Sequence, residues 1–458
     1  MSSHAVDYSS SLRQARTRSA RELSESLRRK SEPLPELHSA EFVEHFDRFG
    51  TSRLVLLGES THGTSEFYRT RAAVTRRLIE NHGFSFVAIE GDWPDVAQLD
   101  GYVRHLAPRP NREQAFARFP QWLWRNEEFA AFIDWLRTYN RDLDPTARVA
   151  LHGLDIYSLQ SSIAAVLEFL DRRDPAQAAA ARQRYSCLTP WQNEPALYGH
   201  EVLSGGNTCE DEAVEQLRTL LLRRLQYLNE DGESFFDAAQ NARVIRSAEQ
   251  YYRLMYRNSA ESWNLRDRHM FDTLQALLAG AANTARVRSN GVARAVVWAH
   301  NSHVGNAAAT SMGWAGEFNI GELCRKAYGN GCTLIGFGTD RGTVAAASDW
   351  GEPMEVKTVL PARDDSYEHA FREAGLPRSL TDWRADADRA LAEQLSHSLL
   401  ERAIGVIYRP ETELQSHYFE SMLGDQFDAW VWFEQTTPVK PLAPGHGTGM
   451  PETYPFGM

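Results

Sequence analysis

Cysteine is scarce in this sequence of 458 residues, and no two cysteines have the Cys-x-x-Cys spacing of a zinc or redox motif. Because they are scattered along the chain, we predict reduced thiols of a cytoplasmic protein, with neither a zinc site nor a disulfide framework. These residues are Cys187, Cys209, Cys324 and Cys332.

Long hydrophobic runs and an excess of positive charge are also absent. No apolar run reaches the ~20 residues that a membrane span needs, and the Ser/Arg-rich first segment lacks the apolar core of a secretory signal. Lys and Arg total 49 against 61 Asp and Glu, which gives a formal net charge of −12. That balance argues against a nucleic-acid or anionic-membrane partner.

The composition divides the chain into three parts. Residues 1–35 are highly charged and end in prolines, so we predict a loosely attached N-terminal helical arm or a flexible segment. Residues 36–440 are predicted to form an α/β domain with a helical insertion at about 165–290, where amphipathic patterns dominate. Residues 441–458 are rich in Pro and Gly, which predicts an extended or disordered tail.

Seven short apolar runs predict the strands of this domain. The runs are nearly continuous and do not alternate, which is typical of strands that are buried on both faces. The predicted fold class is therefore α/β, with a mainly parallel central sheet flanked by helices. The runs span residues 53–59, 84–92, 148–155, 294–303, 333–340, 404–410 and 428–435.

The first four predicted strands each end in ionisable side chains. Ligands of open α/β sheets bind beyond the carboxyl ends of the strands, so these groups should meet in one cleft. A single charged strand end means little, because loop residues are often charged, but four in succession favour a functional site. The groups are Glu59 and His62, Glu90 and Asp92, His152 and Asp155, and His300 and His303, with Asp340 at the end of the fifth strand.

The helix predicted after the first strand carries an arginine on its apolar face. Arg71 lies in the stripe of Phe67, Val74 and Leu78 by the 3.6-residue period. An unpaired buried charge is costly, so Arg71 must pair with a carboxylate or line a polar cleft, unless it snorkels from the edge of the stripe. The candidate partners on nearby strand ends are Glu59 and Glu90.

The segment GESTHG, residues 58–63, is similar to the elbow of serine hydrolases but has one residue too many. The Gly-x-Ser-x-Gly elbow exposes a strained nucleophile, whereas Ser60 is followed by both Thr61 and His62 before the second glycine. We therefore expect Ser60 and Thr61 to form local hydrogen bonds in the turn and not to act as nucleophiles.

Two other chemistries suit these residue types. In the first, His62 removes a proton from water, because an imidazole titrates close to the working pH, and a carboxylate orients the ring. In the second, a Zn²⁺ or Mn²⁺ ion activates the water. The groups that would face the base are Arg71, His300, Asn301 and His303, and the metal ligands would be drawn from Glu59, His62, Glu90, His300 and His303.

The blocks that carry these residues resemble the erythromycin esterase family. They run from about Leu54 to beyond Asp340 and comprise GESTHGTSEFYRTRAAVTRRLIENHGFSFVAIEGDWPD, GLDIYS, NLRDRHMFDTL and VVWAHNSHVG. The resemblance implies an α/β core with a helical insertion, similar to the ChaN-like folds. It also implies a hydrolase that opens the lactone ring of macrolide antibiotics by attack of water, without an acyl-enzyme.

The resemblance also implies roles for individual residues. His62 matches the general base, Glu59 and Glu90 match the motif carboxylates, and Arg71 matches the arginine of the following helix. The paired histidines of the later strand end are matched by His300 and His303. Two further residues are predicted to contact the substrate, namely Asp155 of the GLD motif and Asn301.

We therefore predict a cytoplasmic carboxylic ester hydrolase that opens a macrolide-like lactone and so takes part in the response to an antibiotic. Trp and Tyr residues of the insertion should bury the apolar substrate. The leading prediction requires no cofactor, and the alternative is a divalent metal held by His62, His300, His303 and Glu59. Two rival functions remain, a metal-dependent hydrolase of another ester or amide and a non-catalytic protein that binds a small molecule.

Overall fold

The computed structural model describes residues 2–106, 115–116, 120–192, 194–257, 259–283, 292–384 and 389–443. Its strands are β1 (Glu32–Pro33), β2 (Leu54–Leu57), β3 (Phe86–Asp92), β4 (Ala150–Asp155), β5 (Ala295–Trp298), β6 (Cys332–Ala346), β7 (Glu355–Val359), β8 (Arg378–Asp382), β9 (Leu399–Arg402), β10 (Tyr418–Ser421) and β11 (Ala429–Thr436).

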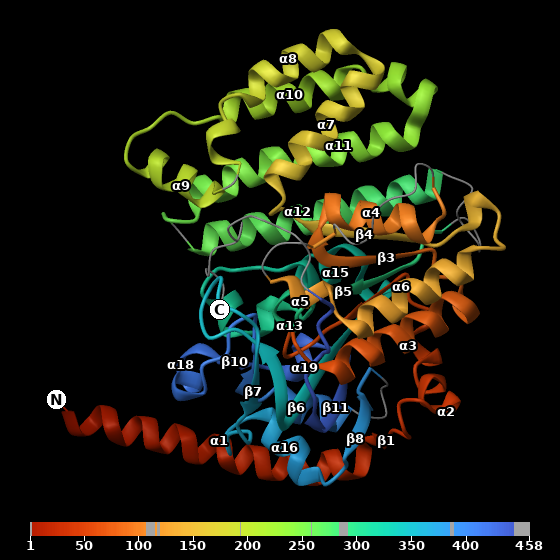
Figure 1. The fold of residues 1–458 in the computed structure, drawn as a ribbon. Helices are drawn as coiled ribbons and strands as arrows, with labels where there is room; N and C mark the ends of the chain where they lie inside the picture. The colour runs from red at the N-terminus through yellow and green to blue at the C-terminus, as the bar shows by residue number, and fades with distance from the viewer. Residues whose placement is uncertain are drawn as a thin grey trace.

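Helices surround these strands, and the longer ones form layers on the two faces of the sheet (Figure 1). They are α1 (Ser2–Lys30), α2 (Ala40–Glu44), α3 (Ser65–His82), α4 (Trp93–Val103), α5 (Gln121–Trp124), α6 (Glu127–Asn140), α7 (Leu159–Arg173), α8 (Pro175–Tyr185), α9 (Pro195–Leu203), α10 (Glu210–Leu222), α11 (Arg224–Leu254), α12 (Ser259–Asn283), α13 (Asn301–Val304), α14 (Ser311–Trp314), α15 (Ile320–Tyr328), α16 (Tyr367–Ala374), α17 (Arg389–Leu395), α18 (Glu413–Ser416) and α19 (Leu423–Gln426).

Within the described residues the central sheet has nine strands, in the order β1-β8-β11-β6-β2-β5-β3-β4, with β7 paired to β6. The six strands from β11 to β4 are all parallel, whereas β1, β7 and β8 run antiparallel to their neighbours. The predicted α/β fold with a mainly parallel sheet is therefore confirmed. The carboxyl ends of β2, β5, β3 and β4 consequently lie side by side at one edge.

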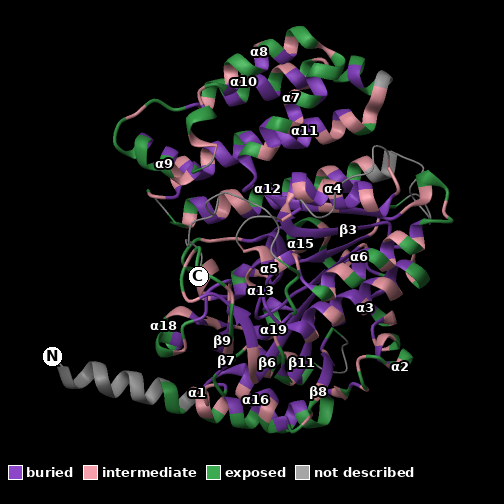
Figure 2. Cartoon of the chain, in the orientation of Figure 1, coloured by how far each residue is buried: buried purple, intermediate pink, exposed green. Residues whose placement is uncertain are grey.

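Burial on both faces explains why the strand sequences are continuously apolar (Figure 2). All four residues of β2 are fully buried, and they alternate between two cores. Val55 and Leu57 belong to the core that contains residues of α3 and α6, while Leu54 and Leu56 belong to the core that contains residues of α12 and α16. The central strand thus has no face in contact with solvent.

Six of the seven predicted strands are present, and one prediction is wrong. Residues 404–410 form no strand, and they make only isolated bridges, Ile404 with Thr61 and Ile407 with Ala347. The segment still lies beside the end of β2, because the Ile404 amide donates to the Ser60 carbonyl and the His62 amide donates to the Ile404 carbonyl. Asp340 does not end its strand either, since β6 continues to Ala346.

The helices from α7 to α11 form a lobe beyond the sheet (Figure 1). They have a core of their own, which includes Ile163, Tyr198, Leu220 and Tyr252. The last helix of the insertion, α12, returns to the sheet and contributes Met270 and other residues to one of the two central cores. Helix α12 is therefore one of the connections between the lobe and the sheet, and its position matters for the site described below.

The predicted N-terminal helix is present as α1, but its second half is packed on the domain and is not loosely attached. The α1 residues Ala20, Leu23 and Leu27 are buried in the same core as Phe371 of α16. These apolar residues recur at a spacing of three and four positions, but the many charged residues around them hide the apolar face in the sequence.

The predicted tail, residues 441–458, lies outside the described residues from 444 onward. Every helix of the described chain is too short or too polar to cross a bilayer.

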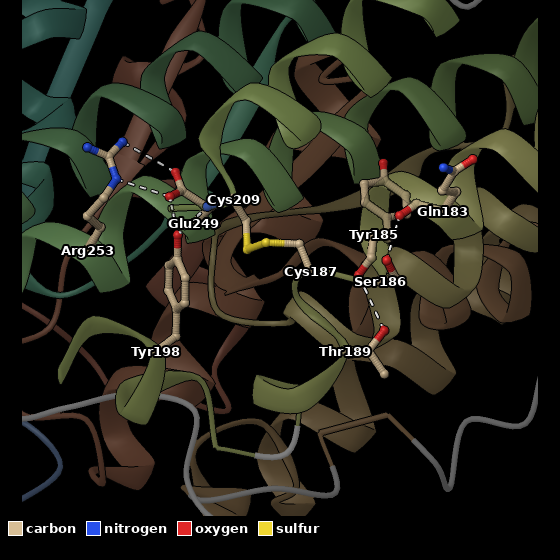
Figure 3. Close-up of a disulfide and its surroundings, with 9 residues drawn as sticks. All are labelled: Gln183, Tyr185, Ser186, Cys187, Thr189, Tyr198, Cys209, Glu249 and Arg253. Carbon is tan, nitrogen blue, oxygen red and sulfur yellow. Dashed lines mark hydrogen bonds and ion pairs between the residues drawn. A yellow bond between two sulfur atoms is a disulfide. The ribbon is translucent and has the colours of Figure 1, made fainter. Parts of the chain in front are cut away.

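Two of the four cysteines are joined, which corrects the prediction of free thiols (Figure 3). Cys187 and Cys209 form a disulfide with their Cα atoms 5.9 Å apart, although 22 positions separate them in the sequence. The chain between them, which includes α9, folds back so that the Tyr198 hydroxyl accepts a hydrogen bond from the Cys209 amide. Because the pairing depends on this helix packing, the spacing of the cysteines gave no signal of it. The free and buried cysteines are Cys324 and Cys332.

The disulfide should stabilise the lobe by restricting its unfolded state. Replacing both Cys187 and Cys209 by serine should lower the free energy of unfolding by about 3 kcal/mol for a loop of this length. Denaturant unfolding of the lobe, followed under non-reducing conditions, measures the change. Dithiothreitol should destabilise the natural protein and leave the double variant unaffected, and an equal response of the two proteins would contradict the pairing.

Candidate active site

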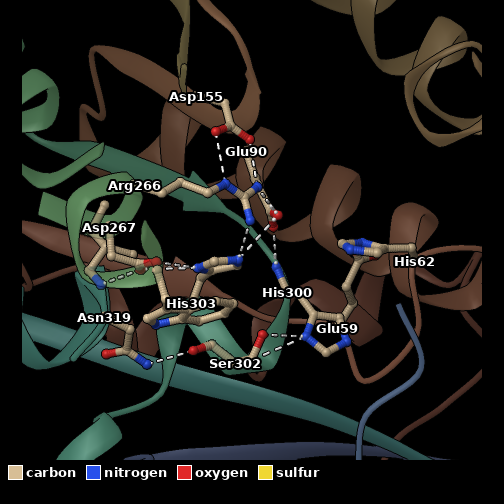
Figure 4. Close-up of polar contacts among 12 residues, drawn as sticks. Glu59, His62, Glu90, Asp155, Arg266, Asp267, His300, Ser302, His303 and Asn319 are labelled. Carbon is tan, nitrogen blue, oxygen red and sulfur yellow. Dashed lines mark hydrogen bonds and ion pairs between the residues drawn. The ribbon is translucent and has the colours of Figure 1, made fainter. Parts of the chain in front are cut away.

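The carboxyl ends of four adjacent strands meet at a cavity of about 570 Å³. His62 follows β2, Glu90 lies in β3, Asp155 ends β4, and His300 and His303 follow β5, and all five line the cavity. Residues that lie far apart in the sequence thus come together as predicted from the strand ends (Figure 4). The arrangement follows the general rule for open α/β sheets.

One side of the cavity holds a histidine that a buried carboxylate orients. His62 Nδ1 lies 2.9 Å from Glu59 Oε1, and Arg71 donates to the other oxygen, Glu59 Oε2, at 2.6 Å. A carboxylate can only accept, so Nδ1 of the neutral ring carries the hydrogen and Nε2 keeps its lone pair. Of the two carboxylates considered as its partner, Glu59 and not Glu90 contacts His62.

Arg71 is completely buried and serves as the counter-charge of Glu59. Its guanidinium lies 4.4 Å from the ring centre of Tyr68 and 5.1 Å from that of Trp298, so two aromatic faces enclose the cation. Neither Arg71 nor Glu59 lines the cavity. The apolar-face arginine predicted from the helix period therefore supports the base from behind.

Glycines frame the GESTHG segment because two other parts of the chain approach its backbone. A Cβ atom at Gly63 would lie 1.9 Å from the Ala345 carbonyl oxygen, and one at Gly58 would lie 2.1 Å from Asn301 Oδ1. Thr61 bonds to Thr64 as expected for a local turn residue. Ser60 Oγ, by contrast, is buried without a hydrogen-bond partner among the described residues.

A second cluster of buried charges surrounds Glu90. Arg266 of α12 binds Asp155 with two nitrogens, at 2.9 and 2.6 Å, and donates to Glu90 Oε1 at 2.8 Å. The second oxygen of Glu90 accepts the His300 amide at 2.9 Å. Burial raises the pKa of Glu90, but nearby His303, Arg266 and His62 more than offset this and hold it well below its usual range.

His303 is held by groups on both of its ring nitrogens. Its Nδ1 lies 3.0 Å from both carboxylate oxygens of Asp267, and its Nε2 lies 3.3 Å from Glu90 Oε1. Trp263 stacks on the imidazole at a centroid distance of 4.5 Å and an angle of 7°. Burial lowers the pKa of His303, but the charges of Asp267 and Glu90 raise it to about 9.

His300 is a neutral imidazole whose tautomer is fixed. Its Nδ1 accepts the Ser302 amide at 3.2 Å, so the ring hydrogen is on Nε2. Burial, together with His62, lowers the pKa of His300 well below its usual range. Within the described residues Nε2 makes no hydrogen bond, and the two imidazole rings of His300 and His62 are 4.9 Å apart. An N–H donor therefore stands beside the candidate base.

Asn301 lies behind the cavity and not in its lining. It is fully buried, donates to the Phe337 carbonyl at 2.9 Å and accepts the Phe337 amide at 3.3 Å. These bonds join the segment after β5 to β6. Asn301 thus fixes the position of the adjacent His300, whereas direct substrate contact by Asn301 has no geometric support. His152 also lies outside the lining, because its ring stacks on Trp93.

Sequence reasoning missed Arg266 and Asp267, although both lie in the NLRDRHMFDTL block. A signal was present, since Asp267 shares one face of α12 with three buried apolar residues at helical spacing. This is the same pattern that singled out Arg71 on α3. The three apolar residues are Trp263, Met270 and Leu274.

Aromatic side chains line the cavity, but the predicted source of these residues is wrong. Within the described residues the insertion at about 165–290 contributes Ser259 and Arg266 and no aromatic residue. The aromatic lining comes from the loops after the strands and from the C-terminal part of the domain. It consists of Phe116, Trp124, Tyr157, Trp350, Tyr418 and Phe419.

The predicted metal ligands do not converge on one point. Across the described residues, no group of three or more His, Cys, Asp or Glu side chains is arranged to hold a metal ion. His62 Nδ1 is bound to Glu59 and His303 Nδ1 is bound to Asp267, so only Nε2 of each ring could face an ion. The described residues therefore bring together no set of three ligands, and the need for a metal stays a prediction.

These features define a class of protein, an α/β protein with a histidine–carboxylate site at the carboxyl ends of its strands. The sequence model of the erythromycin esterase family matches residues 79–436. The chain belongs to the erythromycin esterase family. The match includes Glu90, Asp155 and both cavity histidines after β5, and it begins after His62. Membership of this family supports hydrolase activity.

Known relatives match over most of their length. The Bacillus subtilis (strain 168) protein named "Putative hydrolase YbfO" is 22% identical over 84% of this chain and 84% of its own. A Bacillus cereus protein of known structure superposes with a TM-score of 0.75 and 19% identity, over 93% of this chain and 99% of its own. A mutant of erythromycin esterase EreC in its open conformation gives a TM-score of 0.59 and 19% identity, over 89% and 96%.

Removing the cation behind the base should destabilise the protein strongly. Arg71→Met leaves the carboxylate of Glu59 buried without its counter-charge, which should cost about 3–5 kcal/mol of unfolding free energy. Denaturant unfolding measures the change. Arg69→Met, on the more exposed side of the same helix, is the matched control and should have a small effect. Similar losses of unfolding free energy in the two variants would contradict a stabilising role of the Arg71–Glu59 ion pair.

Proposed function

We propose that this protein is an ester hydrolase that opens a macrolide-like lactone by attack of water, with His62 as the general base. The observation that carries the proposal is the buried series Arg71–Glu59–His62, which leaves the lone pair of His62 Nε2 as the free acceptor of a ring that lines the cavity. A positioned base of this kind contributes a factor of about 10²–10⁴ to a hydrolytic rate.

In the proposed reaction, His62 Nε2 takes a proton from a water molecule as the water oxygen bonds to the ester carbonyl carbon. Glu59 holds Nδ1–H and stabilises the imidazolium that forms. The negative charge on the former carbonyl oxygen requires donors. His300 Nε2–H, beside His62, and Arg266 supply them, and the positive charge of His303 adds to their effect.

A covalent acyl-enzyme is not part of the proposal. Ser60 precedes the base by two positions, but its hydroxyl is buried and is not hydrogen-bonded to a base within the described residues. A serine nucleophile needs a base within hydrogen-bond reach of its oxygen. Direct attack by water agrees with this geometry.

The macrolide substrate is supported by the shape and lining of the cavity and by the names of relatives. A cavity of about 570 Å³ with an aromatic lining suits an apolar ligand that presents few polar groups. EreC, a structural relative, is named an erythromycin esterase. We also propose a role in the response to an antibiotic. The Cys187–Cys209 disulfide favours an oxidising compartment over the cytoplasm that was predicted from scattered thiols.

Loss of the His62 imidazole should abolish most of the activity. His62→Ala should lower kcat/KM for 14-membered macrolides by a factor of about 10²–10⁴, measured by chromatography of the ring-opened product. His38→Ala removes an exposed imidazole and should leave the rate unchanged. Equal rates for the natural protein and His62→Ala would refute the mechanism. Absence of turnover across a broad ester panel would favour the non-catalytic, ligand-binding alternative.

Metal removal separates the proposal from a metal-dependent hydrolase of another ester or amide. The ligand arrangement predicts that protein treated with a chelator, and shown by elemental analysis to be free of metal, retains its full rate. Assays with and without added Zn²⁺ and Mn²⁺ check the result. A rate that disappears on chelation and returns with one of these ions would overturn the metal-free mechanism.

A further inference from the structure

Asp267 is a buried carboxylate that the proposed mechanism does not use directly. It is fully buried, lies on α12, and holds His303 Nδ1 with both oxygens at 3.0 Å. The Ile320 amide, at the start of α15, donates to Asp267 Oδ1 at 2.8 Å. The carboxylate is thus fixed on one side by the backbone and aimed at the imidazole on the other (Figure 4).

The His303 ring is held in place by Trp263, which stacks on its face, and by Asp267, which contacts its edge at Nδ1. Trp263, one helical turn before Asp267, stacks on the ring at 4.5 Å. A flip of the imidazole would put Cδ2 in the place of Nδ1 and would break both contacts with Asp267. The hydrogen on Nδ1 therefore stays on Nδ1, and only Nε2 can gain or lose a proton.

The surroundings of Nε2 suit both protonation states of the ring. Arg266 Nη1 lies 3.0 Å from Nε2 and can donate to it when the imidazole is neutral. Glu90 Oε1 lies 3.3 Å from Nε2 and can accept from it when the ring is positively charged. A proton can thus arrive at or leave Nε2 without any movement of the ring, and His303 lines the cavity where a substrate would bind.

We propose that Asp267 is a positioning residue which, by holding His303 Nδ1–H in both protonation states, makes His303 Nε2 the proton donor to the leaving oxygen. This inference rests on the proposed ester hydrolysis. The water oxygen bonds to the carbonyl carbon and one water proton moves to His62. The bond from that carbon to the ring oxygen breaks, the ring oxygen takes the proton of His303 Nε2, and solvent carries the proton of His62 back to restore His303.

The charges around His303 favour its protonated form before the reaction. Asp267 and Arg266 face it from α12, Glu90 faces it from β3, and neighbouring His300 is neutral. Burial and Arg266 lower the pKa of His303, and the two carboxylates raise it to about 9. Without the charge of Asp267 the pKa should fall, because one of two opposite charges beside the ring is removed.

The experiment compares Asp267→Asn with Asp272→Asn, a matched control at an exposed position of the same helix. Asn keeps an oxygen that can accept the Ile320 amide but carries no charge. The alkaline limb of the pH profile of kcat should move from about 9 to a value lower by ~1–3 pH units, with KM little changed. The control variant should keep the natural profile.

A second measurement requires no substrate. The imidazole proton of His303, assigned with a His303→Gln variant, is titrated by nuclear magnetic resonance in both proteins. The midpoint of the His303 titration should fall in Asp267→Asn, because the charge is lost. It should stay in place in Asp267→Glu, which retains the charge and replaces the amide variant if that variant does not fold. An unchanged midpoint in folded Asp267→Asn would overturn the inference.

The two measurements also distinguish failure of the inference from failure of the proposed function. If the natural protein hydrolyses no ester of the panel, the proposed function is rejected and with it the leaving-group role. If it does hydrolyse them and the pH limb of Asp267→Asn is unchanged, the ester hydrolase remains and the positioning role of Asp267 is rejected.

Discussion

Burial of carboxylates at the ends of parallel strands is the constraint on which the rest of this structure depends. Glu59 follows β2, Glu90 lies in β3 and Asp155 ends β4. All three are buried, so each charge must be matched within the protein. Two arginines supply the match, Arg71 from α3 and Arg266 from α12. The first pair fixes the tautomer of His62, whereas the Ser302 amide fixes that of His300 and Asp267 fixes that of His303.

The two arginines come from opposite sides of the sheet, and each supports a different kind of group. Arg71 and Glu59 stand behind His62 and do not line the cavity, so they orient its ring from within the protein. Arg266 reaches the cavity and joins Glu90 to Asp155. The first charge network therefore orients His62 from behind, and the second lines the cavity. The cavity thus holds a neutral imidazole, His300, beside a positively charged one, His303.

Much of this arrangement could be predicted from the sequence, because strand ends and helix periods are local signals. Apolar runs followed by His and Glu placed Glu59, His62 and Glu90 at one edge, and the 3.6-residue period placed Arg71 behind them. The helix period of α12 carried the same signal for Asp267 as that of α3 carried for Arg71. No local pattern shows that α12 meets the strand ends, because this contact forms only after the long insertion has folded back. The disulfide and the C-terminal wall of the cavity were missed for the same reason, since both depend on packing between segments whose spacing carries no pattern.

Helix α12 packs against both the lobe and the central sheet, whereas other helices of the insertion pack within the lobe. Its Met270 and Leu274 are part of a central core, while α8, α9 and α10 pack only within the core of the lobe. Among the described residues, no side chain from those three outer helices reaches the cavity. Changes in the length or sequence of the outer lobe would consequently leave the lining of the cavity and the charge network at the strand ends untouched.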